Sequence, residues 1–252
     1  MALISTIPFP RATPKSAMRP TEAGTDSATL TFGSNDPDES TYTLALSGQA
    51  AENIILYVPS EYPTISAAID SAFQQDTIEV ATGTYEESVP LLDKNLVFRG
   101  SGRANETIIQ GDGTGPVLTV AGGQNSTTII SHFMIIGGGG TQGGGIKIDG
   151  SSTPVLNHLI LSSNAVSGNG GGIAIMSGGA DLSFTSISNN TAGGSGVALY
   201  AAASASVVLN HSILWDNGNT EIGSFGNVDV SYSIVAGGAE GTGNLELDPL
   251  FV

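Results

Sequence analysis

The chain has 252 residues, of which 6% are aromatic and 35 are glycine, and it contains no cysteine. Its formal net charge of −16, from 23 acidic and 7 basic residues, argues against partners with phosphate backbones and against anionic lipid surfaces. The lack of cysteine excludes disulfides and thiolate metal sites, and no run of about 18 apolar residues is present that could cross a membrane as a helix.

The first 22 residues are rich in proline, carry scattered charge and show no apolar period. This composition predicts a disordered N-terminus over residues 1–22. The segment also lacks the continuous apolar stretch of a signal peptide. Export of the protein is therefore expected only from the family resemblance described below.

Residues 27–32 (SATLTF) and 41–47 (TYTLALS) alternate apolar and polar side chains, and the residues between them are turn formers. Region 23–50 is therefore predicted to be a β-hairpin. It resembles the last two strands of immunoglobulin-like domains of the ASPM-SPD-2-Hydin type. That resemblance implies the remnant of a truncated domain.

A short amphipathic helix is predicted after Pro63, with one apolar face and an end at residues 74–76. The apolar face consists of Ile65, Ala68, Ile69, Ala72 and Phe73. We expect this helix to stand just before the first coil of a solenoid and to cover its open strand edges. Strand-like runs follow at Thr77–Val80, Asn95–Phe98, Thr107–Ile109 and Val117–Val120.

From residue 127 the sequence repeats about every 26 residues. Two buried stacks are predicted from the repeat. One contains Met134, Ile160, Ile187, Ile213 and Ile234, and the other Ile146, Ile173 and Val197 after glycine-rich corners. Residues 55–252 are therefore predicted to form an all-β, right-handed parallel β-helix that begins with a short capping α-helix.

Several phrases of the repeat resemble bacterial right-handed parallel β-helix repeat proteins of the pectate-lyase-like superfamily. They are Ser-Asn-Asn-Thr-Ala (188–192), Gly-Gly-Gly-Ile (143–146 and 170–173) and Leu-Asp-Pro-Leu-Phe-Val (247–252). Residues 57–111 are also similar to the opening of pectin methylesterases, through YVPSEYPTISAAIDSA, DTIEVATGTYEES, KNLVFRGSG and TIIQG. The resemblance implies an exported or cell-surface bacterial protein that contacts polysaccharides.

The catalytic motifs of these families are not found in the later coils. The methylesterase forms GQAVAL, QDTL and DFIFG are absent there, and Gln75-Asp76-Thr77 precedes the first predicted coil. A lyase would need a base, and Lys147, the one basic residue of the repeats, is expected to point outward beside Asp149. We therefore expect no catalytic residue, no metal site and no cofactor. Whether the protein is an enzyme stays open, and the missing motifs argue against it.

A hydrolase of galacturonan would need neighbouring carboxylates on adjacent coils. The aspartates of the repeats are Asp149, Asp181, Asp216 and Asp229, and they are expected to share no register.

The three histidines, His132, His158 and His211, recur with the repeat, with Thr185 at the missing position and Tyr232 at the next. Each stands two residues before a predicted core position, so the ladder is expected to face inward and to be structural rather than a metal site.

An outward apolar strip is predicted from Phe133 with Leu159 and from Ile135 with Leu161. This strip would serve as a partner or sugar-stacking surface, or would be covered by the N-terminal hairpin.

Two functions follow from these observations. The first is a non-catalytic exported or cell-surface β-helix module that binds glycans or acts as an adhesin, with ligand-binding residues unknown. The alternative is a fragment of a carbohydrate-active enzyme, either a polysaccharide lyase or a pectinesterase-like protein. The chain is further predicted to be a fragment cut at both ends, whose uncapped last coil promotes self-association.

Overall fold

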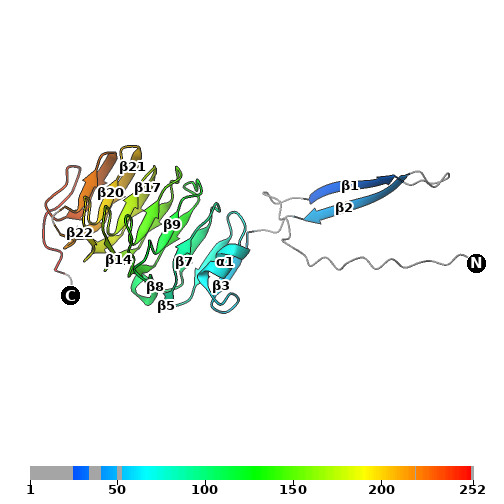
Figure 1. Ribbon diagram of the computed structural model, residues 1–252, viewed down its shortest axis with the longest axis horizontal. Coiled ribbons are helices and arrows are strands. Elements are labelled where there is room, and N and C mark those ends of the chain that lie inside the picture. Colours follow the sequence, from blue (N-terminus) through cyan, green and yellow to red (C-terminus); the bar gives the residue numbers. More distant parts are fainter. Residues whose placement is uncertain (1–24, 34–40, 50–52, 219, 251–252) are drawn as a thin grey trace, which may run out of the picture. The chain divides into compact units, whose positions relative to one another are not determined.

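The structure is a computed structural model that describes residues 25–33, 41–49, 53–218 and 220–250 (Figure 1). It divides the chain into two units, Met1–Glu52 and Asn53–Val252. The disorder predicted for residues 1–22 and the turn predicted at 34–40 lie outside the described residues.

The first unit contains the two predicted strands of the hairpin. β1 (Thr25–Gly33) pairs antiparallel with β2 (Thr41–Gln49), with Leu30 opposite Leu44 and Phe32 opposite Tyr42. Both strands cover the segments in which the sequence alternates apolar and polar residues.

The second unit is a parallel β-helix, as predicted, built from three parallel sheets (Figure 1). The eight-stranded sheet contains β3 (Ile55–Val58), β4 (Thr77–Val80), β7 (Val97–Gly100), β10 (Ile129–Ser131), β13 (Val155–Asn157), β17 (Gly178–Ser183), β21 (Ala205–Asn210) and β24 (Asn227–Ser231). The seven-stranded sheet contains β5 (Gly83–Glu86), β8 (Thr107–Gln110), β11 (Met134–Ile136), β14 (Ile160–Ser162), β18 (Ser186–Ser188), β22 (Ile213–Trp215) and β25 (Ile234–Val235).

The six-stranded sheet contains β6 (Val89–Pro90), β9 (Leu118–Val120), β12 (Ile146–Ile148), β16 (Ile173–Ile175), β20 (Leu199–Ala201) and β23 (Ile222–Ser224). β15 (Ala165–Val166) and β19 (Thr191–Ala192) form a small parallel pair, and η1 (Ala104–Glu106) is a single 3₁₀ turn. The coils from β4 to β23 therefore each pass once through each of the three main sheets. No helix among the described residues is long and apolar enough to cross a membrane.

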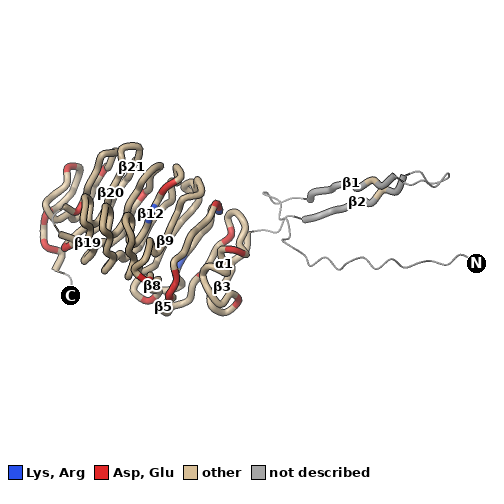
Figure 2. Tube along the Cα trace, viewed as in Figure 1, with Lys and Arg blue, Asp and Glu red and all other residues tan. Residues whose placement is uncertain are grey.

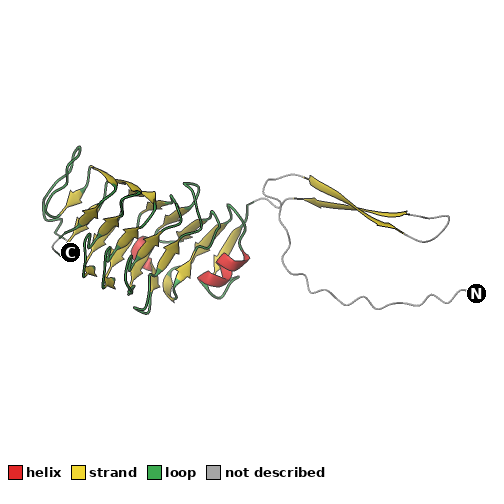
Figure 3. Cartoon of the chain, turned by 45° about the horizontal axis from the view of Figure 1, so that its top comes forward, coloured by secondary structure: helices red, strands yellow, loops and turns green. Residues whose placement is uncertain are grey.

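The predicted helix is α1 (Ile65–Ser71), and it lies at the end of the solenoid that holds β3 (Figure 3). Thr64 caps it by accepting a hydrogen bond from the backbone of Ala67, and the helix buries Ile65, Ala68 and Ile69. Its expected place before the first coil is wrong, because β3 precedes it and pairs with β4. α1 thus takes the place of the other two sheets in the first coil.

The expected buried stack on the seven-stranded sheet is displaced by one residue. Met134 pairs with Ile160, Ile160 with Ser186, and Ser186 with Ile213, and the side chains of this row face outward and are half-buried. The buried row is the next one along, namely Ile109, Ile135, Leu161, Ile187, Leu214 and Val235. Of the predicted stack, only Ile187 is in the core.

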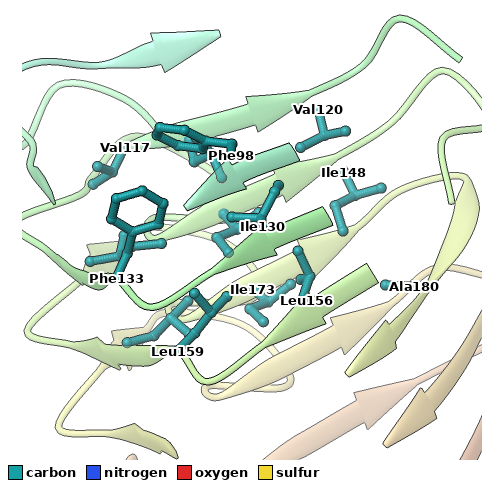
Figure 4. Close-up of a cluster of buried hydrophobic side chains, with 14 of the residues drawn as sticks. Phe98, Val117, Val120, Ile130, Phe133, Ile148, Leu156, Leu159, Ile173 and Ala180 are labelled. Carbon is teal, nitrogen blue, oxygen red and sulfur yellow. The ribbon is translucent and has the colours of Figure 1, made fainter. Parts of the chain in front are cut away.

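The predicted outward strip is wrong for the same reason. Phe133, Leu159, Ile135 and Leu161 are all at most 1% exposed, and Figure 4 shows Phe133 and Leu159 within the cluster of core side chains. Phe133 packs against Phe98, with ring centroids 4.4 Å apart.

The second predicted stack is correct except for its third member. Ile146 pairs with Ile173 as expected, but Ile173 pairs with Leu199 rather than Val197, and Leu199 pairs with Ile222.

The chain after β25 turns back over the last coil. Thr242 accepts a backbone hydrogen bond from Tyr232, Asn244 accepts one from the backbone of Ser233, and Leu245 forms a parallel bridge with Ile234. These contacts cover part of the edge of β25.

Candidate functional site

The outward side of the seven-stranded sheet combines apolar and hydroxyl-bearing side chains. We call it the outer face, and it consists of Ile108, Gln110, Met134, Ile136, Ile160, Ser162, Ser186, Ser188, Ile213, Trp215 and Ile234. All of these side chains are half-buried. Because strands of one sheet lie about 4.8 Å apart, they form straight rows along the solenoid axis.

The outer face is almost free of charge in a chain with a net charge of −16. From β11 to β22, the described residues of this face and of the bends on both sides include two carboxylates, exposed Asp216 and buried Glu221, and no lysine or arginine. Glu240 and Glu246 follow β25. Figure 2 shows how sparse basic residues are along the solenoid. A partner that lies on this face gains little from carrying charge of either sign.

A column of stacked rings borders the outer face at the bend from the eight-stranded to the seven-stranded sheet. We call it the ring ladder, and its members are His132, His158, Phe184, His211 and Tyr232. Successive ring centroids are 4.9, 5.1, 5.2 and 5.3 Å apart, and adjacent ring planes differ by 4° to 26°. The faces of the inner rings are covered by their neighbours, so these rings present their edges to solvent.

The backbone explains the ladder. All five residues have φ between 48° and 62°, the left-handed region that turns the chain sharply between two strands. A residue in this conformation at the same place in every coil directs its side chain outward. The predicted inward ladder is therefore wrong: His158 and His211 are exposed, Phe184 fills the missing position, and Thr185 is buried instead.

Burial lowers the pKa of His132 below its ordinary value, and the neighbouring His158 and Arg99 lower it further. His132 is the half-buried member of the ladder. Both effects disfavour the imidazolium at this position.

A second ladder, which sequence reasoning missed, follows the opposite edge of the outer face. Asn164, Asn190 and Asn217 are at most 4% exposed and donate to one another and to core carbonyls. The ladder ends at Glu221, whose carboxylate accepts from the backbone and side chain of Asn217. Burial raises the pKa of Glu221. The spacing of these asparagines, 26 and 27 residues, was the available sequence signal.

The residues considered for catalysis are distributed over separate surfaces. Lys147 lies outward between buried Ile146 and Ile148, as expected, with its Nζ 3.8 Å from Asp149. Its successors in register are Ala174 and Tyr200. Asp76 is buried and accepts from the backbones of Ile54 and Phe73, so it closes a turn.

One expectation about the aspartates needs correction. Asp181 and Asp229 share an outward row on the eight-stranded sheet, with Val208 between them. Asp149 and Asp216 lie outside this row.

An open depression of about 310 Å³ lies at β5 and β8, beside Gln110 at one end of the outer face. Glu86, Glu87, Gln110 and Asp112 line it. Glu87 accepts from the backbones of Ile65 and Ser66 at 2.8 and 3.0 Å and so holds the start of α1. Hydrogen bonds from Thr114 lower the pKa of Asp112, so its carboxylate stays ionised rather than acting as a general acid.

Acid–base hydrolysis of a glycoside needs one carboxylic acid with a raised pKa beside an ionised carboxylate. Glu221 is the described carboxyl group whose pKa is clearly raised, and it accepts a hydrogen bond from Asn217 in the interior. Among the described residues no group of three or more histidine, aspartate or glutamate side chains could hold a metal ion. The outer face and the ring ladder bring apolar, hydroxyl and imidazole side chains together, and they form the candidate site.

No known family model matches this chain, and no curated protein matches it.

Proposed function

We propose that the second unit is a non-catalytic binding module whose outer face takes an uncharged polysaccharide. The observation that carries the proposal is the neutrality of this face from β11 to β22 in a strongly acidic chain. An anionic glycan such as a polyuronate would be repelled by the surrounding carboxylates, whereas a neutral one would not.

The chemistry of the outer face matches that of a sugar chain. Sugar rings offer C–H faces to apolar side chains and hydroxyl groups at their edges. Met134, Ile160 and Ile213 provide the apolar surface, and Trp215 provides the single indole of the chain. Ser162, Ser186 and Ser188 supply hydroxyls between them.

The cellular setting of the proposal rests on the resemblance to pectate-lyase-like β-helix proteins. It implies an exported or cell-surface bacterial protein, in which a solenoid acts as an adhesin-like module. The alternative, a fragment of a polysaccharide lyase or pectinesterase-like enzyme, is disfavoured by the committed hydrogen bonds of Glu87 and Glu221.

Sedimentation with insoluble cellulose, chitin, xylan and curdlan, and retardation in gels that contain soluble polygalacturonate, tests the proposal. We expect at least one neutral polymer to bind and polygalacturonate not to bind. Trp215→Ala should weaken binding about tenfold, since an aromatic contact with a sugar contributes roughly 1 kcal/mol or more. Phe225→Ala is the matched control, because Phe225 is 72% exposed and lies after β23, at the end of another sheet.

Preferential binding of polygalacturonate, or equal loss of binding in the Trp215 and Phe225 variants, would place the ligand elsewhere.

A further inference from the structure

We propose that His158 and His211 are acceptors for ligand hydroxyl groups along the ring ladder, each held in one tautomer by the asparagine before it. The inference rests on the proposed function, because the ladder borders the outer face that takes the polysaccharide. It adds the residues that determine specificity.

The two histidines share one local arrangement. Nδ1 of His158 lies 3.2 Å from Oδ1 of Asn157, and Nδ1 of His211 lies 3.1 Å from Oδ1 of Asn210. An amide oxygen only accepts hydrogen bonds, so Nδ1 must carry the proton. In a neutral imidazole the other nitrogen, Nε2, is then an acceptor.

The stacking of the ladder leaves this acceptor at the surface. His158 lies between His132 and Phe184, and His211 lies between Phe184 and Tyr232, so the ring faces are covered. Both histidines are exposed, so the ring edges with Nε2 are what a ligand meets. Asn157 and Asn210 act through the imidazoles and are positioning residues.

The other members of the ladder do not repeat the arrangement. Ser131 precedes His132, and Ser183 precedes Phe184, which has no ring nitrogen. The two acceptors therefore lie two coils apart, roughly 10 Å at about 4.8 Å per strand. This spacing suits an extended, neutral polymer with hydroxyl groups repeating along one edge.

Nitrogen-15 NMR of the imidazoles in the full chain tests the tautomers without any ligand. We expect His158 and His211 to be protonated at Nδ1 at neutral pH. Asn157→Val should release His158 from this tautomer and leave His211 unchanged. Protonation at Nε2 in both residues of the wild type would overturn the inference.

Sedimentation with cellulose, chitin, xylan and curdlan then tests recognition. The double variant Asn157→Val, Asn210→Val should bind roughly tenfold more weakly, as expected for two lost or misdirected hydrogen bonds. Ser183→Val is the control, because it changes the same outward row before Phe184.

The possible failures are distinguishable. Wild-type binding that the double variant retains overturns the acceptor role and leaves the proposed function standing. No binding by the wild type to any of the four polymers overturns the proposed function itself and the acceptor role with it.

Discussion

The two bends that flank the outer face use the same backbone conformation for opposite purposes. On one side, His158 and His211 adopt positive φ and project outward into the ring ladder. On the other side, Ser163 and Asn189 adopt positive φ, and the residue after each directs an amide into the core. The coils of β14, β18 and β22 therefore each carry one residue of the interior ladder and one residue of the exterior ladder.

The two ladders are expected to contribute different things: the interior ladder stabilises the fold, and the exterior ladder serves ligand recognition. Each interior asparagine links buried polar groups, because its amide donates to a core carbonyl, such as that of Ile135 or Leu161, and to the next buried side chain. Removal of such a partner costs the full desolvation of the groups left behind. The exterior rings stack on one another but keep their edges in water, so replacing one of them leaves no buried polar group behind.

The largest expected effect comes from breaking the interior ladder. Asn190→Ala removes the acceptor of Asn164 and the donor to Leu161 and Asn217, so it should lower the free energy of unfolding by about 3 kcal/mol. Urea denaturation measures the loss. Asn189→Gly, at the neighbouring exposed position with φ of 54°, is the control and should change stability by about 0.5 kcal/mol or less. Equal losses in the two variants would mean that the buried amides do not carry the stability.

Breaking the exterior ladder should cost less. His158→Asn keeps a residue that tolerates positive φ but removes the stacking with His132 and Phe184. We expect a loss of about 1 kcal/mol in the same denaturation experiment, since exposed aromatic contacts contribute roughly 0.5–1.5 kcal/mol. A loss as large as that of Asn190→Ala would remove the distinction between the two bends.

The pH dependence of stability gives a smaller effect, and it also compares the interior ladder with the exterior ladder. Burial raises the pKa of Glu221 above 4.5, so the folded state holds the proton more tightly than the unfolded state. Its contribution is present below about pH 4.5 and is lost as the pH rises through the pKa of the folded state. The difference in unfolding free energy between wild type and Glu221→Gln should therefore fall as the pH rises. A difference that grows with pH would contradict the buried carboxyl.

The exterior ladder should respond in the opposite direction. Burial and the neighbouring His158 lower the pKa of His132 below 6.5, so the unfolded state binds the proton more tightly. Stability from this residue is present above pH 6.5 and is lost as the pH falls through the pKa of the folded state. Urea midpoints between about pH 7 and pH 5 should fall less in His132→Asn than in wild type. Parallel pH profiles would exclude His132 as the source.

The fold was predictable from the sequence, but the register of the outer face was not. Apolar residues occupy both sides of the seven-stranded sheet, as in the neighbours Ile160 and Leu161, or Ile213 and Leu214. The alternation of apolar and polar residues therefore does not tell which side of the sheet faces the core until Ser186 and Ile187, where the serine faces outward. One coil of the repeat is a residue longer than its neighbours. Aligning Ile160 with Ile187 assigns the extra residue to the coil before Ile187, whereas the structure has it in the coil after Ile187.

The same displacement hid the candidate site. The one-residue error led to the prediction that the histidines face inward and that Thr185 stands where the structure has Phe184. The aromatic residue at that position was nevertheless visible in the sequence. The interior ladder was missed for a different reason: asparagines in a turn-rich repeat look like exposed turn formers. Only the three-dimensional register shows that Asn164, Asn190 and Asn217 face the core.

Trp215 offers the most direct test of the outer face, because it is the one tryptophan of the chain and lies on that face. Its fluorescence can be titrated with soluble neutral oligosaccharides and, in parallel, with oligogalacturonates. We predict a saturable change and protection from acrylamide quenching with a neutral oligosaccharide, and neither with the oligogalacturonates. Saturable protection by the oligogalacturonates alone would contradict the account.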